Sequence, residues 1–281
     1  MTQDKNEGVA KGQFDLAWDD HHVIPEIIYP DLDFLFQRMN QATVDAVSAR
    51  EDETILDIGC GRALDDIELA RRKARCYGLE LSNKMITFAR KHISDSGFEI
   101  RLVRGAGERL PFKEACFDKV FCKGAIDHFP DPDRAVDEIA RVLKPGGKAV
   151  ITVANYESLS FKLGRRLVKL IEVVYKGRAD DKKVWQVPHD HVYKFDHAFL
   201  MKLVKPHLNV ERVVGISMFF GFPWWGLLLS KLPRRVSAPI LRFLDRLARR
   251  APSLSDIVLV ECSRRNGADT TGQARCSRST S

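Results

Sequence analysis

The spacing of apolar residues predicts an alternation of strands and helices through the middle of the chain. Short apolar runs of the kind found in buried strands occur at residues 54–58, 76–80, 100–103, 117–122 and 148–153. Segments with the 3.6-residue spacing of helices lie between several of them, at residues 64–73, 85–92 and 135–143. Ser82 is the expected N-cap of the second of these helices. The alternation predicts an α/β fold built on a parallel sheet.

The same reading predicts further elements toward both ends of the chain. Helices are expected at residues 14–47 with a break at Pro25, and at 158–175, 197–207 and 239–250. Two more strands are expected at residues 210–218 and 256–262. Residues 1–13 and 265–281 are polar and lack periodicity, so both are expected to be disordered.

The first apolar run leads into a glycine turn. Asp57 interrupts the run, and Gly59-Cys60-Gly61 follows it before the helical segment at 64–73. Glycines let the backbone turn tightly and let a ligand approach closely. A strand, a glycine turn and a helix in this order predict a nucleotide-like ligand at the carboxyl end of the strand. Leu64 stands at the third glycine position of a dinucleotide fingerprint, and no Gly-Lys-Ser/Thr of a P-loop is present.

Two later motifs restrict the class of nucleotide-like ligand that the chain is expected to bind. Glu80 ends the second apolar run, where a carboxylate can accept hydrogen bonds from both hydroxyls of a ribose. R-V-L-K-P-G-G at 141–147 reads as a helix end and a proline-glycine turn into another strand. D-I-G-C-G, then E-L-S at 80–82, then R-V-L-K-P-G-G resembles the class I S-adenosylmethionine-dependent methyltransferases. The nearest resemblance is to the subgroup that acts on small molecules and lipids, and it is close over residues 50 to 155.

The resemblance implies a fold, a cofactor and a set of binding residues. The implied fold is a doubly wound, Rossmann-like seven-stranded sheet in the order 3-2-1-4-5-7-6, with strand 7 antiparallel. The implied cofactor is S-adenosyl-L-methionine, with its methionine part at Asp57 and the glycine turn and its ribose at Glu80. The cofactor-binding residues expected on this basis are Asp57, Gly59, Cys60, Gly61, Glu80, Leu81, Met85, Gly107, Glu108 and Lys123.

One loop departs from the family pattern. Residues 105–112 read G-A-G-E-R-L-P-F, where the family usually has G-D-A-E-x-L-P-F and its aspartate hydrogen-bonds the adenine amino group. Ala106 occupies the position of that aspartate. Backbone groups around Gly107 and Glu108 are left to read the adenine edge, so cofactor affinity or base selectivity is expected to differ.

The segment after the fourth predicted strand carries the candidate catalytic groups. K-G-A-I-D-H-F-P-D at 123–131 is close to the family's turn and short helix, which lie where the methyl group emerges. Asp127 and His128 are therefore candidate general bases or substrate-orienting residues. The alternative is that His128 caps or packs the loop. A base is needed only for a hydroxyl or protonated-nitrogen acceptor, and the atom that is methylated stays open.

The resemblance also divides the chain. Residues 1–49 are expected to form an N-terminal helical cover and residues 50–264 the methyltransferase domain, with cap insertions at 156–196 and 219–255 and a tail at 265–281. Candidate substrate-binding aromatics and histidines in these added segments are Trp18, Tyr29, His189, His191 and Tyr193. Trp18 and Tyr29, in the N-terminal segment, have the alternative role of packing that segment against the rest of the protein. The H-D-H run at 189–191 lacks a third ligand at a diagnostic spacing, so no metal is expected.

Charge and apolar patterning add a possible partner. The net charge is +7, and residues 156–252 carry 19 basic against 8 acidic side chains. The second insertion holds M-F-F-G-F-P-W-W-G-L-L-L at 218–229, flanked by arginines, which suits contact with an anionic membrane interface. The alternative is a lid over the pocket or a subunit seam. No apolar run reaches the roughly 18 residues of a spanning helix.

Composition bears on location and on competing functions. The polar first dozen residues predict no signal peptide, and six cysteines without a C-x-x-C pair fit reduced thiols in a cytoplasmic protein. A cofactor-binding scaffold without turnover is the main alternative, favoured by Ala106. A nucleic-acid methyltransferase would explain the basic block, but K-G-A-I-D-H stands where an N/D-P-P-Y/F motif belongs. The oligomeric state stays open.

Overall fold

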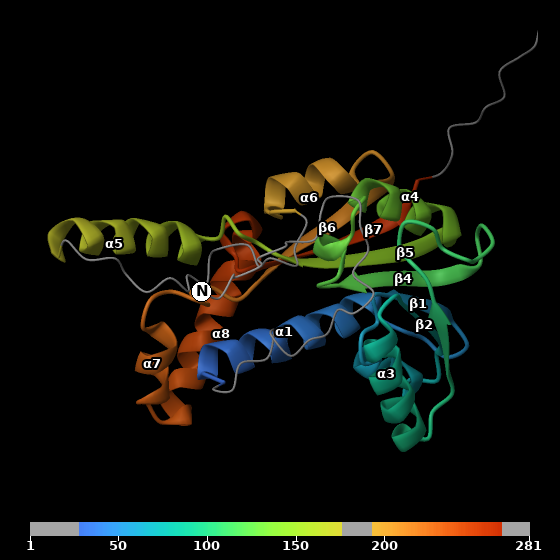
Figure 1. Cartoon of the computed structure of the whole chain (residues 1–281), viewed down its shortest axis with the longest axis horizontal. Coiled ribbons are helices and arrows are strands. Elements are labelled where there is room, and N and C mark those ends of the chain that lie inside the picture. The colour runs from blue at the N-terminus through green and yellow to red at the C-terminus, as the bar shows by residue number, and fades with distance from the viewer. Residues whose placement is uncertain (1–27, 176–192, 266–281) are drawn as a thin grey trace, which may run out of the picture.

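A seven-stranded sheet forms the centre of the molecule (Figure 1). The computed structural model describes residues 28–175 and 193–265. The strands lie in the order β3-β2-β1-β4-β5-β7-β6. Neighbours among β1 to β5 run parallel, and β7 is antiparallel to both β5 and β6, which confirms the predicted sheet. The strands are β1 Thr54–Ile58, β2 Arg75–Glu80, β3 Ile100–Arg104, β4 Phe117–Lys123, β5 Leu143–Ala154, β6 Leu208–Ile216 and β7 Ile257–Arg264.

Helices cover both faces of this sheet. α1 and α2 pack on one face and share a hydrophobic core with it, while α4 and α6 pack on the opposite face (Figure 1). The helices are α1 Pro30–Val47, α2 Leu64–Ala70, α3 Asn83–Ser96, α4 Pro132–Val142, α5 Leu159–Tyr175, α6 His197–Val204, α7 Trp225–Ser230 and α8 Arg234–Arg250. Two short 3-10 helices are η1 Ile126–His128 and η2 Pro252–Leu254.

The apolar runs of the sequence are central strands because both of their faces are covered. Ile55 and Leu56 of β1 are completely buried, one in each of the two cores. Ser82 caps α3, as predicted, by accepting a hydrogen bond from the backbone N–H of Met85 at 3.3 Å. The central sheet therefore presents the carboxyl ends of β1, β2 and β4 at one edge, where their connecting loops gather.

Two elements begin five residues before their predicted starts. β5 begins at Leu143, five residues before the predicted start, because Leu143 pairs with Phe117 of β4 across a register shift. α8 begins at Arg234, five residues before Pro239, because Pro233 forms its N-cap and accepts backbone hydrogen bonds from Val236 and Ser237. Pro239 thus lies inside the helix, where it removes one backbone donor.

The segment between β6 and β7 packs against the first helix. Gly226 of α7 lies so close to α1 that an added Cβ would stand 2.7 Å from Asp31 Oδ1 and 2.9 Å from Tyr29 Cβ. Arg38 of α1 forms an ion pair with buried Asp245 of α8 at 3.2 Å. This segment and the helix from the N-terminal part of the chain are therefore one packed unit.

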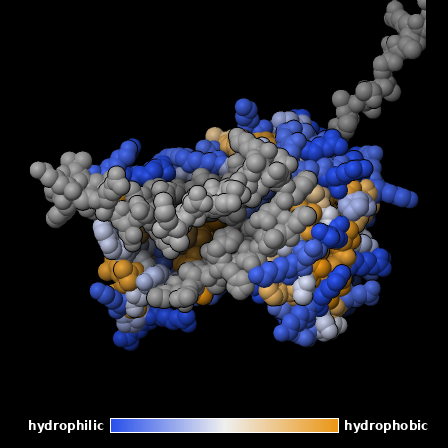
Figure 2. Space-filling view, viewed as in Figure 1, coloured by the Kyte–Doolittle hydropathy of each residue, from blue (hydrophilic) through white to orange (hydrophobic). Residues whose placement is uncertain are grey.

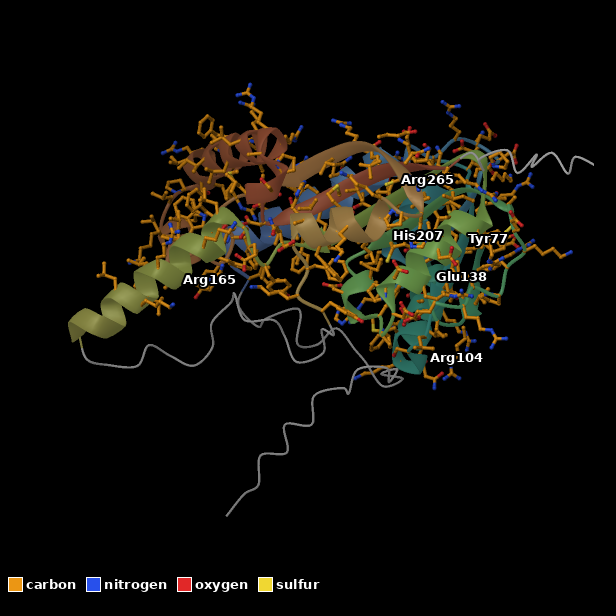
Figure 3. All side chains as sticks on the ribbon, turned by 90° about the horizontal axis from the view of Figure 1, so that it is seen from above. Tyr77, Arg104, Glu138, Arg165, His207 and Arg265 are labelled. Atoms are coloured by element: carbon orange, nitrogen blue, oxygen red, sulfur yellow. The ribbon has the colours of Figure 1, made fainter. Side chains whose placement is uncertain are left out.

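A buried aspartate fixes the root of the same segment. Asp256, just before β7, accepts a hydrogen bond from the backbone N–H of Phe220 at 2.9 Å and another from the Ser160 hydroxyl of α5. Burial raises the pKa of Asp256 to about 7. α5 projects away from the sheet from this point (Figure 1), and Arg165 near the start of α5 forms an ion pair with Glu157 at 2.8 Å (Figure 3).

No helix in the described part of the chain is long and apolar enough to cross a membrane.

Candidate cofactor and catalytic site

The glycine turn after β1 is held against the neighbouring strand. The backbone N–H groups of Gly59 and Cys60 both donate to the carbonyl of Leu79 in β2, at 2.8 and 3.0 Å. Gly59 has φ +75° and Gly61 has φ +53°, in the left-handed region that favours glycine. An added Cβ on Gly59 would meet the Ala125 Cβ at 2.4 Å. The loops after β1 and β4 thus approach each other as closely as a glycine permits.

Glu80 joins the ends of β1 and β2 through its carboxylate. One oxygen accepts from the N–H of Gly61 at 3.0 Å, and the other from the N–H groups of Leu81 and Ser82, each at 2.8 Å. The residue is buried, with 8% of its surface exposed. A carboxylate offers about four lone-pair positions, so these three donors leave acceptor capacity for a ligand hydroxyl. Met85 lies on the other side of the turn, with its Cε 3.5 Å from an added Cβ on Gly61.

Two buried carboxyl groups lie beneath the turn. Asp57 of β1 and Asp66 of α2 are buried, and no donor in the described part of the chain reaches Asp57 Oδ1 or either Asp66 oxygen. Burial, together with the charges of Asp66 and Asp65, raises the pKa of Asp57 well above its usual range. Burial and the charge of Asp65 raise the pKa of Asp66 to about 7. The sequence reading had identified only Asp57 of this pair.

Lys123 connects three elements at the end of β4. Its ammonium group forms an ion pair with Asp65 of α2 and donates to Asn40 Oδ1 of α1 at 2.7 Å. Lys123, whose charge acts to lower the pKa of both Asp57 and Asp66, is thus already engaged by Asp65. Lys123 was expected to bind the cofactor, and in the structure its ammonium links α2 to α1.

The loop that carries the departure from the family pattern is clamped by α4. The N–H of Leu110 donates to Glu138 of α4 at 2.8 Å, and Arg141 donates to the carbonyls of Leu110 and Phe112 at 3.1 and 2.9 Å (Figure 3). Ala106 is half-buried at the start of this clamped loop. The loop therefore has a fixed backbone next to the end of β2, despite the missing aspartate.

The same loop contacts the segment after β4 through two residues. An added Cβ on Gly107 would lie 2.5 Å from the Phe129 ring, so the ring packs directly against the loop backbone. Glu108 accepts from the N–H of Asp131 at 3.3 Å, while its second oxygen is buried without a donor among the described residues. Burial raises the pKa of Glu108. Sequence reasoning missed Phe129, and the glycine opposite it was the only signal.

The candidate catalytic residues lie in η1, beside the glycine turn. Asp127 is buried and His128 is half-buried, and the His128 N–H donates to the carbonyl of Ala125 at 3.0 Å. Ala125 is the residue that meets Gly59. The hydroxyl of Tyr193 donates to the carbonyl of Pro130 at 3.1 Å. Asp127, His128 and Tyr193 are therefore gathered at the carboxyl end of β4.

The remaining predicted substrate residues are not all placed here. Tyr29 lies at the start of α1 against α7, and Trp18, His189 and His191 fall outside the described residues. Within residues 28–175 and 193–265, no cluster of three His, Cys, Asp or Glu side chains could hold a metal ion.

These groups fit a cofactor that joins a nucleoside to an amino acid. Glu80 can accept from ribose hydroxyls, the glycine turn allows close approach, and the carboxyls beneath it suit an ammonium group. The order of the strands in the sheet and this arrangement of site residues are those of the class I S-adenosylmethionine-dependent methyltransferases. Residues 56–151 match the family described as a methyltransferase domain. This part of the chain is a methyltransferase domain of that class, whose cofactor is S-adenosylmethionine.

Similar proteins agree with this assignment over part of the chain. A ubiquinone biosynthesis O-methyltransferase of Xylella fastidiosa (strain 9a5c) is 32% identical over 129 residues, which are 44% of this chain and 52% of that protein. A demethylmenaquinone methyltransferase of Desulfitobacterium hafniense (strain Y51) is 31% identical over 163 residues, 54% of this chain and 63% of that protein. The chain thus spans between half and two thirds of these relatives. A SAM-dependent methyltransferase from Aquifex aeolicus shares the fold, with TM-score 0.51, 14% identity and coverage of 80% and 89% of the two chains.

Proposed function

We propose that the protein transfers a methyl group from S-adenosylmethionine to a small lipophilic acceptor. The observation that carries the proposal is the Glu80 carboxylate, which ties the glycine turn to the end of β2 and keeps acceptor capacity. When bound, the cofactor supplies a methyl group that is already activated on a sulfonium. The task of the chain is then to position the two reactants, and such positioning is worth roughly 7–11 kcal/mol in well-oriented reactions.

The residues proposed to bind the cofactor surround the ends of β1 and β2. Asp57 and the turn would hold the methionine part and Glu80 the ribose, with the loop at residues 105–112 against the adenine. The full proposed set is Asp57, Gly59, Cys60, Gly61, Glu80, Leu81, Met85, Gly107, Glu108 and Lys123. Lys123 would act through Asp65, since its ammonium is engaged there.

The acceptor is proposed to be a quinone-type ring with an apolar tail. The support is that the two curated relatives are named for ubiquinone and menaquinone methylation. Asp127 and His128 would orient a ring hydroxyl and accept its proton, because they lie at the end of β4 next to the glycine turn. Tyr193, and Trp18, Tyr29, His189 and His191 from the flanking segments, are the proposed substrate-binding residues.

Labelled cofactor tests this function. The protein is incubated with methyl-labelled S-adenosylmethionine and either a lipid extract or a synthetic phenolic quinone precursor, and the labelled product is identified. Label should enter a lipophilic product, and His128→Asn should lower turnover without changing cofactor affinity. Cofactor binding without label in any product would support the scaffold alternative. Equal binding of NAD would overturn the assignment of the site.

We further propose that α7 and α8 contact an anionic membrane surface from the cytoplasmic side. Trp224, Leu227 and Leu228 are exposed by 62%, 46% and 53%, and Figure 2 shows a hydrophobic patch over α7. α8 follows directly with six arginines and one aspartate. Exposed aromatic and leucine side chains beside arginines suit the headgroup region of a membrane.

The aromatic segment divides into an outward and an inward part. Trp224 is exposed, whereas Phe219 packs edge-on against Phe222 at 5.8 Å and tilted against Trp225 at 6.1 Å. The inward rings support the lid interpretation and the outward patch the membrane interpretation, so both apply to different residues. Residues 219–255 are proposed as the membrane-facing insertion, 156–196 as the substrate-side insertion, and 1–49 as the cover of the 50–264 domain.

Vesicle co-sedimentation tests the membrane contact. The protein should bind vesicles containing phosphatidylserine, and binding should fall with added salt because the arginines contribute on the order of 1 kcal/mol each near the surface. Changing Trp224, Leu227 and Leu228 to serine should abolish binding while the fold persists. Leu170→Ser is the matched control, because Leu170 is equally exposed but lies on α5. If the protein does not bind vesicles at low salt, the proposed membrane contact is contradicted. The methyl acceptor is then expected to be a soluble small molecule.

A further inference from the structure

The segment after β4 touches both of the loops proposed to hold the cofactor. Ala125 meets the glycine turn, since its Cβ would lie 2.4 Å from a Cβ added to Gly59. Further along the segment, the N–H of Asp131 donates to Glu108 of the loop clamped by α4, at 3.3 Å. Between these two points η1 is closed by the hydrogen bond from the His128 N–H to the Ala125 carbonyl. The segment therefore bridges the two loops.

The Phe129 ring lies between the same two loops. Its Cε2 and Cζ atoms would stand 2.5 and 2.9 Å from a Cβ added to Gly107, which is closer than real Cβ atoms approach a neighbour. The same Cζ would stand 4.0 Å from a Cβ added to Gly59, which is ordinary van der Waals contact. One ring atom thus lies next to both glycines, while the side chain also packs against the hydrophobic core.

Gly107 is required by this ring and not by its own backbone. Its φ is not in the left-handed region, so the backbone conformation by itself does not call for glycine. The family pattern usually has alanine at this position of the loop, and in this chain the methyl group of an alanine would collide with Phe129. The ring therefore stands where the Cβ of that alanine would be.

We infer that Phe129 is a positioning residue for methyl transfer, whose ring sets the separation of the two cofactor loops. The inference rests on the proposed function. An aromatic ring is rigid, and Gly59 and Gly107 let it approach both backbones, so its size fixes the gap that the cofactor spans. Because Asp127 and His128 lie in the same segment as the ring, the same contacts hold these two side chains in place beside a bound cofactor.

This role predicts that a ligand which spans both loops depends on the ring more than a ligand that reaches only one. S-adenosylhomocysteine carries the adenosine and the amino-acid part, so it would contact both loops. 5′-Methylthioadenosine keeps the adenosine and lacks the amino-acid part. Leucine lacks the ring atoms Cε2 and Cζ, so Phe129→Leu should bind S-adenosylhomocysteine about tenfold more weakly and leave the affinity for 5′-methylthioadenosine nearly unchanged.

Isothermal titration calorimetry of a double-mutant cycle tests the inference. Gly107→Ala should also weaken the binding of S-adenosylhomocysteine about tenfold, because the new methyl group pushes the loop and the ring apart. Combining Gly107→Ala with Phe129→Leu removes the two ring atoms closest to that methyl group, so affinity should recover to within about threefold of the wild type. A residue that only fills the core would show no such recovery.

Turnover provides a second readout. With methyl-labelled S-adenosylmethionine at saturation and a synthetic phenolic quinone precursor as acceptor, Phe129→Leu should lower kcat, because a displacement of about 1 Å between reacting groups can cost on the order of 100-fold. Phe98→Leu is the matched control, because Phe98 is likewise half-buried against a hydrophobic core but lies just before β3, at the opposite end of the sheet. It should lower stability without changing kcat or the affinity for either ligand.

The outcomes separate the inference from the function on which it rests. If the wild type does not bind S-adenosylhomocysteine, the proposed function fails. If it binds, but Phe129→Leu keeps the wild-type affinity or loses the same affinity for both ligands, the inference is overturned. Lack of recovery in the combined variant overturns it as well. Should Phe129→Leu fail to fold, Phe129→Met fills more of the volume of the ring and is judged by the same criteria.

Discussion

Replacing Glu80 separates its two roles, as the clamp of the glycine turn and as the proposed ribose acceptor. The carboxylate accepts three backbone N–H groups, from Gly61, Leu81 and Ser82, at 2.8–3.0 Å. Glu80→Ala removes the acceptor for all three at once. Glu80→Gln keeps one oxygen and the side-chain volume, and its amide can turn so that Leu81 and Ser82 remain bonded and only Gly61 loses its acceptor.

The expected losses follow from these contacts. An orphaned buried donor costs about 1–3 kcal/mol, so Glu80→Gln should lower the free energy of unfolding by about that amount. Glu80→Ala should cost more, on the order of 3–5 kcal/mol, since water can reach only some of the freed donors. Both variants should bind the cofactor more weakly, because charge-assisted ribose bonds worth roughly 1.5–3 kcal/mol correspond to a loss of about tenfold to 150-fold.

Urea denaturation and calorimetry measure the two effects separately. Unfolding of the apo protein gives the stability term, and titration of S-adenosylhomocysteine well below the melting temperature gives affinity. The predicted order of stability is wild type, then Glu80→Gln, then Glu80→Ala. An unchanged unfolding midpoint in Glu80→Ala would show that the three contacts do not hold the turn. Unchanged affinity in a folded variant would remove Glu80 from the cofactor site.

Two further changes test the adenine loop and the root of α5. Ala106→Asp should tighten the binding of S-adenosylhomocysteine about tenfold, which is the value of one charge-assisted hydrogen bond at the low end of its range. Ala106→Leu is the control for side-chain size. If calorimetry shows a loss of affinity in Ala106→Asp, another group reads the adenine edge. Asp256 has a folded-state pKa of about 7, above its ordinary 3.8, so the native state retains a proton that the unfolded chain loses between about pH 4 and 7. Its contribution to stability is therefore complete below pH 4 and lost as the pH rises through 7. Asp256→Asn should flatten the fall in the free energy of unfolding between pH 5 and 8. If urea denaturation gives the wild type and the variant the same dependence of stability on pH, this interpretation is refuted.

The sheet was predictable because its signals are local or are carried by motifs. The central strands are buried on both faces and so appear as continuous apolar runs, and the strand order followed from the resemblance that Asp57, the glycine turn and Glu80 establish. The N-cap of α3 at Ser82 was an equally local signal. α7 was not predicted, because six residues are too few to display a helical period.

The site was only partly predictable, for a physical reason. Asp57, Gly59 and Glu80 lie in a motif, but Asp66 becomes a partner of Asp57 only when α2 folds back under the turn. Two adjacent aspartates at the start of an apolar-spaced helix were the one visible signal. The engagement of Lys123 by Asp65 and Asn40 likewise depends on three elements meeting, and no pattern along the chain encodes that meeting.

The pairing of β6 with β7 has a consequence for the changes of sequence that the chain can tolerate between these two strands. Ile216 and Ile257 are direct cross-strand partners, so the forty residues between them leave and re-enter the sheet at points only about 5 Å apart. A chain closed by such a ladder tolerates changes of length between its ends, because closure entropy grows slowly with loop size. The limit on such changes is the packing of α7 and α8 on α1, through Gly226 against Asp31 and the ion pair of Arg38 with Asp245. A graft of a different segment at these two isoleucines would therefore have to rebuild the contacts with α1, whereas the proposed cofactor site, at the ends of β1, β2 and β4, lies on the far side of β5.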